Sequence, residues 1–329
     1  MKKILLLSTG GTIASVKSDH GLVPKLSAKA ILEFIPQLSK LCEVEYEEIL
    51  NLDSSNIQPK HWKLIANKIY TSVSNYDGFV ITHGTDTMAY TASMLSFMLL
   101  GISKPIILTG SQLPIVFPNT DAKENLYHAF LTAITELTGI YIVFNKKIIQ
   151  GVRAKKLHTE HINAFESVNA SLVGHIENDK IILSYIPKQF TDSFHLYNNI
   201  DNSIFLLKLV PGINSEIIPQ LVKMGYKAII LESFGAGGIP HRTKNFLYEI
   251  EKAIDLGITV ICTTQCIFGS VSNRYEVGIK AAQIGVLSAK DMTIEALYTK
   301  LMWVLGQTNQ KQIIKEMMEY NYCGEITNS

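Results

Sequence analysis

Long apolar runs are missing from this sequence. The longest candidate, Met94–Leu100, is interrupted by Ser96 and ends at Gly101, whereas a membrane span needs about 18 apolar residues. The start of the chain, MKKILLLSTGGT, places only four aliphatic residues in a row, whereas a signal peptide needs an apolar core of ~7–15 residues. We therefore expect neither a membrane span nor a cleaved leader.

Cysteine and net charge are scarce as well. The four cysteines, Cys42, Cys262, Cys266 and Cys323, show neither zinc-ligand spacing nor a dense disulfide pattern, so we expect reduced thiols in a cytoplasmic protein. The formal net charge is +1 and no basic stripe is visible, which gives no indication of a nucleic-acid partner. Neither G-x-G-x-x-G nor a P-loop motif occurs, and we expect no nucleotide cofactor and no metal.

The chain is long enough for two domains. It has 329 residues, 47% of them hydrophobic, and domains of ~100–200 residues are usual. Apolar segments typical of buried strands alternate with amphipathic segments, which predicts a doubly wound α/β domain. The expected strands are 4–7, 45–50, 78–83, 105–109, 140–144, 172–175 and 180–184, and the expected helices are 28–34, 59–74, 88–100 and 121–137.

A second α/β domain follows a polar, aperiodic stretch. We predict a larger N-terminal domain over 1–187, a linker over 188–203 and a smaller C-terminal domain over 204–329. In the latter we expect strands at 204–209, 228–231 and 259–264, and helices at 215–224, 243–256 (with Thr243 as its cap), near 276, at 293–305 and at 310–318. The polar stretch 14–25, with Gly21 and Pro24, predicts a mobile loop of the kind that acts as a lid.

The first strand ends in an unusual cluster of polar residues. The segment Lys3–Thr12 reads KILLLSTGGT, so an apolar strand runs directly into two glycines flanked by threonines. Adjacent glycines allow a sharp turn and a close approach of a ligand. Ligands of open α/β sheets bind outside the carboxyl ends of the strands. Thr12 is therefore placed where a hydroxyl nucleophile is useful, although a glycine turn with a capping threonine is an equally good interpretation.

Polar residues also follow three other strands. They are Asp53-Ser54-Ser55-Asn56, Gly84-Thr85-Asp86-Thr87 and Gly110-Ser111-Gln112. Ordinary turn chemistry and helix capping account for such residues equally well. The cationic stretch Gly151–His158, which contains Arg153, Lys155 and Lys156, would normally be a solvated surface patch.

Together these groups fit acyl transfer without a metal or cofactor. A threonine hydroxyl is a poor nucleophile unless a base removes its proton. A lysine from the pair Lys155 and Lys156 can act as that base only if burial or its neighbours favour the neutral amine. Backbone amides at the glycine turns could stabilise an oxyanion. The candidates are Thr12, Thr85, Asp86 and one of these lysines.

The order and spacing of these motifs resemble the L-asparaginase family, most closely its type I, cytoplasmic bacterial members. Thr9–Ala14 (TGGTIA) and His83–Thr87 (HGTDT) resemble the two signature motifs of that family. The resemblance extends over essentially the whole chain through Asp53–Ser55, Thr109–Pro114, Arg153–Lys156 and Thr263–Cys266. It implies a larger and a smaller α/β domain assembled as a homodimer or homotetramer.

The resemblance also implies a role for each site residue. Thr12 would attack the side-chain amide of L-asparagine and form an aspartyl ester, which is hydrolysed after ammonia leaves. Thr85, Asp86 and Lys156 would form the second catalytic group, since the family motif ends in its lysine. Asp53, Ser54 and Asp86 would hold the α-amino and α-carboxylate groups, and Ser111 would contact the amide.

Three positions depart from the family pattern. Leu22 stands where many members carry a lid tyrosine that orients the nucleophile, and leucine cannot form that hydrogen bond. Lys155 stands where a threonine is frequent, which places a second cation beside Lys156. Glu232 stands where some type I members use an arginine to bind an allosteric asparagine. Because a carboxylate repels the carboxylate of that effector, we expect no allostery of that form.

Three alternatives stay open. The D-type component of the archaeal glutamyl-tRNA(Gln) amidotransferase shares this core but has an additional domain before the T-G-G-T strand, which begins here at Lys3; we expect no such domain. A catalytically silent amino-acid-binding or regulatory protein would need neither nucleophile nor base. A preference for glutamine is also possible, because one methylene in a pocket is worth only ~1–3 kcal/mol.

Overall fold

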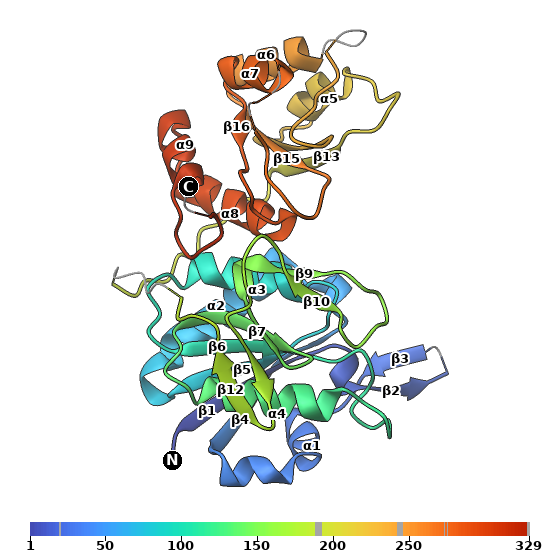
Figure 1. Cartoon of the computed structure of the whole chain (residues 1–329), viewed down its shortest axis with the longest axis vertical. Coiled ribbons are helices and arrows are strands. Elements are labelled where there is room, and N and C mark those ends of the chain that lie inside the picture. The colour runs from blue at the N-terminus through green and yellow to red at the C-terminus, as the bar shows by residue number, and fades with distance from the viewer. Residues whose placement is uncertain (20, 188–192, 242–245, 273, 275, 328–329) are drawn as a thin grey trace. The chain divides into compact units, whose positions relative to one another are not determined.

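The computed structural model describes residues 1–19, 21–187, 193–241, 246–272, 274 and 276–327. It consists of two compact units, each of which is described by itself (Figure 1). The first unit comprises Met1–Asn198 and Tyr322–Gly324, and the second comprises Asn199–Asn321 and the chain from Glu325 onward. The expected fold class, a larger N-terminal and a smaller C-terminal α/β domain, is confirmed. Residues 188–192 of the predicted linker lie outside the described part.

An eight-stranded mixed sheet forms the first unit. Its strand order is β12-β11-β8-β7-β6-β5-β1-β4. Strands β7, β6, β5, β1 and β4 run parallel to one another, and β8, β11 and β12 extend the sheet from β7 in antiparallel fashion. The bounds are β1 Lys3–Gly10, β4 Glu43–Leu52, β5 Gly78–Thr82, β6 Pro105–Thr109, β7 Gly139–Phe144, β8 Lys147–Gln150, β11 Gly174–Glu177 and β12 Lys180–Leu183.

Helices cover both faces of this sheet (Figure 1). Successive side chains of a strand point to opposite faces. Ile4 and Leu6 of β1 share a core with α1 (Ala28–Glu33) and α4 (Ala122–Ala133), and Leu5 and Leu7 therefore point to the opposite face, where α2 (Pro59–Ser72) and α3 (Met88–Met98) lie. Burial on both faces explains why the first strand is apolar throughout.

The direction of winding reverses beside β1. The chain passes from β1 to β4 on one side and then crosses to β5 on the other, so that Leu5 is paired with both Glu45 and Phe79. In open α/β sheets the ligand site lies at such a switch point, outside the carboxyl ends of the strands. Here that place is the end of β1, which is Gly10 with Gly11 after it, and the end of β5, where His83 follows.

The predicted mobile loop over 14–25 is wrong. Ser15–Ser18 (β2) and Gly21–Pro24 (β3) form an antiparallel hairpin, with Val16 opposite Val23. β-branched residues favour strands, and proline is tolerated at the end of an edge strand. The prediction gave too much weight to Gly21 and Pro24 as breakers and too little to the two valines.

The stretch around residue 153 also differs from the prediction. After β8, residues Gly151–Arg153 form a 3-10 turn that leads into β9 (Ala154–Lys156), and β9 is paired with β10 (Phe165–Ser167). Arg153 is only 2% exposed. The expected surface patch is therefore wrong for this residue, whose guanidinium lies inside the first unit.

A four-stranded parallel sheet forms the second unit. Its order is β13 (Ile204–Lys208), β14 (Ala228–Ser233), β15 (Thr259–Thr264) and β16 (Leu287–Ser288). The helices are α5 (Ile217–Lys223), α6 (Phe246–Asp255), α7 (Glu276–Gln283), α8 (Ile294–Gln307) and α9 (Lys311–Glu319). The predicted cap Thr243 lies outside the described residues. Across the described chain, we find no helix whose length and apolar character would suit a membrane crossing.

Candidate active site

The two glycines at the end of β1 bring the first loop against the loop after β5. Gly10 and Gly11 have φ values of +97° and +80°, which favour glycine. A Cβ atom on Gly11 would lie 2.4 Å from the amide nitrogen of Gly84, so no other residue fits there. Thr12, the next residue, begins a short 3-10 turn and is half-buried. The T-G-G-T and H-G-T-D motifs therefore meet through their backbones.

The loops after β4 and β6 join the same cluster. A Cβ on Gly84 would lie 2.6 Å from Ser54 Oγ, and one on Gly110 would lie 2.2 Å from the His83 carbonyl oxygen. Thr87 Oγ1 donates a hydrogen bond to the Ser54 carbonyl at 2.8 Å. Four separate loops thus converge at the switch point of the sheet, as their positions at strand ends predicted.

Lys156 reaches this cluster from β9. Its Nζ donates to Thr85 Oγ1 at 2.8 Å and lies 2.7 Å from Asp86 Oδ1. The lysine side chain is 18% exposed and the aspartate side chain 62%. A surface ion pair contributes at most about 1 kcal/mol to stability, so the value of this contact is that it aims the ammonium at the threonine hydroxyl. The predicted grouping of Thr85, Asp86 and Lys156 is observed.

Gln112 is a member of the site that the sequence analysis did not single out. Its side-chain oxygen accepts a hydrogen bond from Thr85 Oγ1 at 3.2 Å, and its amide nitrogen donates to the carbonyls of Thr159 and His161. Thr85 therefore accepts from Lys156 and donates to Gln112, which fixes the direction of its hydroxyl. The only sequence signal was its place beside Ser111 in the T-G-S-Q-L-P motif.

A carboxylate shapes the loop that carries Ser111. Asp121 accepts hydrogen bonds from the backbone amides of Gln112 and Leu113 at 3.0 Å each. Ser111 is fully buried, and its hydroxyl donates to the Leu113 carbonyl at 2.6 Å. In this structure the Ser111 hydroxyl is thus engaged within its own loop.

Asp53 and Ser54 occupy the turn after β4. Asp53 Oδ1 accepts from the amide and the hydroxyl of Ser55 at 2.8 and 2.6 Å, so the capping interpretation is correct for this residue. Its side chain is exposed and Ser54 is buried against Gly84. Ser54 is therefore held directly beside the H-G-T-D loop, and Asp53 lies next to it along the chain.

His83 is a buried neutral histidine under the loop. Its Nδ1 lies 2.7 Å from the Gly84 carbonyl, which can only accept, so Nδ1 carries the proton. Nε2 then accepts from Thr91 Oγ1 at 2.9 Å, and Thr91 accepts from Trp62 Nε1 at 2.9 Å. Complete burial lowers the pKa of His83 from 6.5 to about 4. This chain of hydrogen bonds holds the carbonyl just before Thr85.

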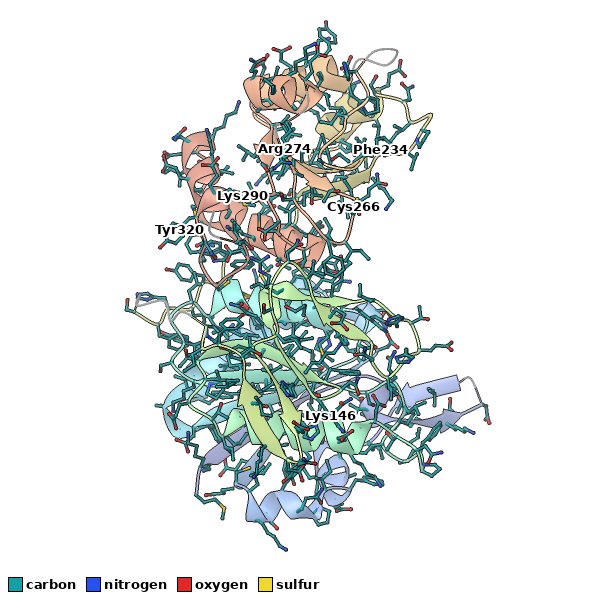
Figure 2. The ribbon with its side chains drawn as sticks, viewed as in Figure 1. Lys146, Phe234, Cys266, Arg274, Lys290 and Tyr320 are labelled. Atoms are coloured by element: carbon teal, nitrogen blue, oxygen red, sulfur yellow. The ribbon has the colours of Figure 1, made fainter. Side chains whose placement is uncertain are left out.

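The three positions that depart from the family pattern lie on three different strands, β3, β9 and β14. Leu22 is 49% exposed on the hairpin, opposite Lys17, and Lys155 is half-buried on β9. Glu232 lies on β14 of the second unit, where its carboxylate is 3.3 Å from Lys208 Nζ. Cys266 and Phe234 follow the ends of β15 and β14 in the same unit (Figure 2).

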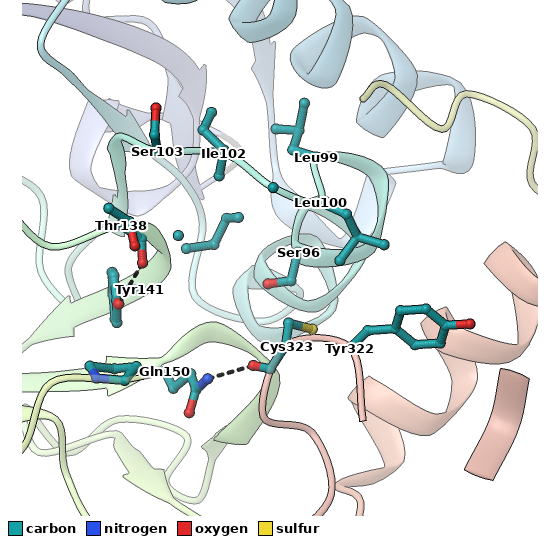
Figure 3. A pocket seen from close by; sticks show the side chains of 14 residues that line it. Ser96, Leu99, Leu100, Ile102, Ser103, Thr138, Tyr141, Gln150, Tyr322 and Cys323 are labelled. Atoms are coloured by element: carbon teal, nitrogen blue, oxygen red, sulfur yellow. Dashed lines mark hydrogen bonds between the residues drawn. The ribbon is translucent and has the colours of Figure 1, made fainter. Parts of the chain in front are cut away.

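No metal site accompanies these groups in the described ranges, because no three His, Cys, Asp or Glu side chains there are arranged to hold an ion. A cavity of about 110 Å³ in the first unit lies elsewhere (Figure 3). Ser103 and Thr138 line it, and these residues precede β6 and β7. The cavity is therefore at the amino ends of the strands, opposite the converging loops.

Comparisons with known proteins agree with the fold and the motifs. The family model described as "Asparaginase, N-terminal" matches residues 3–189, and the model described as "Glutaminase/Asparaginase C-terminal domain" matches residues 203–318. The fold and the site define a two-domain α/β enzyme with hydroxyl, carboxylate and lysine groups at the switch point of a parallel sheet. The chain belongs to the asparaginase family.

The similarity spans the whole chain. The chain is 42% identical to the L-asparaginase of Thermococcus kodakarensis, and the match covers 99% of this chain and 100% of that protein. The solved thermostable L-asparaginase of that organism superposes with a TM-score of 0.94 at 40% identity, covering 99% of this chain and 100% of that one. L-asparaginase I of Vibrio cholerae gives a TM-score of 0.90 at 32% identity, covering 99% of each chain. The D-type component of the glutamyl-tRNA(Gln) amidotransferase of Pyrococcus abyssi is 35% identical over 99% of this chain and 77% of its own length.

Proposed function

We propose that this protein is an L-asparaginase, which hydrolyses the side-chain amide of L-asparagine to L-aspartate and ammonia. The observation that carries the proposal is that the loop of Thr12 packs, through Gly11, on the loop whose Thr85 and Asp86 contact Lys156, in a chain that belongs to the asparaginase family. A match that covers the full length of an L-asparaginase, and 77% of the D-type amidotransferase component, favours the first.

In the proposed reaction the Thr12 oxygen attacks the carbonyl carbon of the amide. The carbon–nitrogen bond breaks, the hydroxyl proton passes to the leaving nitrogen, and ammonia departs, which leaves an aspartyl ester on Thr12. Water then adds to the ester carbon, and cleavage of the carbon–oxygen bond returns the Thr12 hydroxyl and releases L-aspartate. Covalent catalysis of this type divides one difficult hydrolysis into two easier steps.

We assign proton transfer and the orientation of the reacting groups to Thr85, together with Lys156 and Asp86. Lys156 Nζ is within 2.8 Å of both Thr85 Oγ1 and Asp86 Oδ1, a distance suited to proton transfer. Asp53 and Ser54 would bind the α-amino and α-carboxylate groups, with Asp86 also facing the ammonium. The side chain of Ser111 would have to exchange its bond with the Leu113 carbonyl for one with the amide.

We further propose a cytoplasmic homodimer or homotetramer that needs no cofactor and binds neither nucleic acid nor membrane. The support is the near balance of charge, +1, and the four cysteines without disulfide spacing. The runner-up function, a catalytically silent amino-acid-binding protein, has the same fold, and turnover is what separates the two.

The deciding experiment measures ammonia release from L-asparagine and from L-glutamine by the wild type, Thr12→Ala and Thr12→Ser. We expect asparagine turnover that Thr12→Ala abolishes and Thr12→Ser, which keeps a hydroxyl, partly retains. Hydroxylamine added during turnover should trap the acyl group as aspartyl hydroxamate. A folded wild type that releases no ammonia would favour the binding protein, and turnover that survives in Thr12→Ala would show that Thr12 is not the nucleophile.

A further inference from the structure

A buried arginine lies three residues before Lys156. Arg153 is 2% exposed, and its Nε donates a hydrogen bond to the Gly324 carbonyl at 2.6 Å. Burying a guanidinium is costly unless its N–H groups are paired. A bond between a buried cation and a carbonyl more than a hundred residues away in sequence therefore fixes both partners.

The partner of Arg153 belongs to a short segment that we call the tail segment, Tyr322–Gly324. It is part of the first unit, although the residues on either side of it belong to the second. The Gln150 side-chain amide donates to the Cys323 carbonyl (Figure 3). Gly324 has a φ of +88°, and a Cβ atom there would lie 2.3 Å from Gln150 Nε2. Two consecutive carbonyls are thus held by Gln150 and Arg153, and a side chain at position 324 would displace the Gln150 amide and strain the backbone.

The stretch that holds the tail segment continues directly to Lys156. Gln150 ends β8, Gly151–Arg153 form the 3-10 turn, and β9 begins at Ala154. The Gly151 carbonyl accepts a hydrogen bond from Ser93 Oγ at 3.3 Å, and the Arg153 carbonyl accepts one from the Val168 amide at 2.8 Å. The turn is therefore fixed along its length, and β9 carries that position forward to the lysine.

We propose that the tail segment supports the active site by fixing the turn Gly151–Arg153, which sets where Lys156 places its ammonium. Arg153 and Gly324 are positioning residues that act through Lys156. The inference rests on the proposed function, because kcat is its kinetic readout. Misplacing a catalytic group by about 1 Å can cost ~100-fold in rate, so the effect is large enough to measure.

The first test replaces Gly324 with alanine. Gly324→Ala should lower kcat for L-asparagine by about 10- to 100-fold and change KM by less than about twofold, because the proposed binding residues Asp53 and Ser54 are untouched. The matched control is Gly225→Ala: Gly225 has a φ of +85° and open space around its Cβ position. It introduces the same backbone strain without a clash and should keep the wild-type kcat. An equal loss in both variants would contradict the proposal.

A second pair of variants, at Arg153, keeps the proposal testable if Gly324→Ala does not fold. Arg153→Met removes the donor to the Gly324 carbonyl, whereas Arg153→Lys retains one. We expect Arg153→Met to lower kcat and Arg153→Lys to recover part of the loss. Wild-type kcat in folded Arg153→Met would overturn the inference.

Hydrogen–deuterium exchange provides a readout that is independent of turnover. Backbone amides of the β9–β10 pair should exchange faster in Gly324→Ala and Arg153→Met than in the wild type, and at the wild-type rate in Gly225→Ala. If the wild type releases no ammonia, the proposed function fails while exchange still tests the support of β9. If the wild type is active and exchange at β9–β10 is unchanged in both variants, the positioning role fails and the proposed function stands.

Discussion

His83 shows how a single buried residue couples the site to stability. Its ring connects the Gly84 carbonyl to Thr91 and, through Thr91, to Trp62. Protonation would place two N–H groups on the ring, and Nε2 could then no longer accept from the Thr91 hydroxyl. Burial and the hydrogen bond from Thr91 therefore favour the neutral ring, and burial outweighs the opposite effect of the Gly84 carbonyl on the pKa.

This arrangement predicts a loss of stability in acid. The pKa of His83 falls from 6.5 in the unfolded chain to about 4 in the folded one, so between those pH values the unfolded state binds more protons. Stability must then fall as the pH falls from about 6.5 to about 4. At about 1.4 kcal/mol per pH unit, the loss amounts to about 3 kcal/mol.

The measurement is the free energy of unfolding from pH 7 to pH 4, by urea denaturation. His83→Asn lacks the titrating ring and should show a shallower dependence on pH, whatever its absolute stability. His175→Asn, at an exposed position, is the matched control, and the contrast between the two slopes carries the result. Identical slopes in His83→Asn and the wild type would refute this account.

Charged and polar residues are also where the sequence-based predictions were weakest. Arg153 was expected at the surface and is buried, and Gln112 was not singled out although it fixes the Thr85 hydroxyl. Lys156 was chosen over Lys155 by resemblance to a motif, and Lys156 Nζ is in contact with Thr85. A side chain's type gives its chemistry, whereas its partner and its burial depend on segments far away in sequence.

At the scale of elements, the long buried strands and the polar residues at their ends were predicted best. The runs that became β1, β5 and β6 are apolar and end in glycine with threonine or serine, and each polar end lies at the site. Such runs are recognisable because strands buried on both faces need no alternation. The short strands β8, β9 and β10 were missed, since three or four residues carry too little periodicity to be recognised.

The hairpin β2–β3 is connected directly to the loop that carries Thr12. It follows Thr12–Ala14 directly, and the amides of Lys25 and Leu26, which follow β3, both donate to the Ala14 carbonyl at 2.9 Å. On the hairpin, Lys17 Nζ lies 5.5 Å from the centre of the Phe117 ring. An exposed cation–π contact is worth about 0.5–1 kcal/mol, enough to bias the hairpin toward its place over the loop that carries Phe117.

We therefore expect Lys17→Gln to raise KM for L-asparagine by about two- to fivefold, which corresponds to that contact energy, and to leave kcat nearly unchanged. Steady-state kinetics provide the measurement. Lys25→Gln removes an exposed cation at the end of the hairpin and serves as the control, with KM as in the wild type. If both variants raise KM equally, net charge rather than the contact with Phe117 is responsible.

At the scale of the whole molecule, the prediction about regulation depends on Glu232 of the second unit. Glu232 occupies the position where some type I members carry an arginine for an allosteric asparagine, and its carboxylate lies beside Lys208. A carboxylate that is already paired, and that repels another, is a poor receptor for the effector's carboxylate. We therefore expect a rate that depends hyperbolically on L-asparagine concentration.

Initial rates over a wide range of L-asparagine concentrations test this expectation. The curve should give a Hill coefficient of about 1 in the wild type, as expected without coupling between sites, and Glu232→Gln should keep that shape. A sigmoidal curve that a non-hydrolysed analogue converts to a hyperbola would show that this protein is allosteric despite Glu232.

The α/β class, the two domains and the polar residues at the strand ends could be predicted from the sequence, because apolar runs and glycine motifs are local patterns. The tertiary structure decided which groups meet. Gly11 packs against Gly84, Lys156 reaches Thr85 from a strand that the sequence did not reveal, and Gly324 fixes Arg153. Each of these contacts joins segments distant in the chain, and such contacts depend on how the sheet is wound rather than on any local pattern.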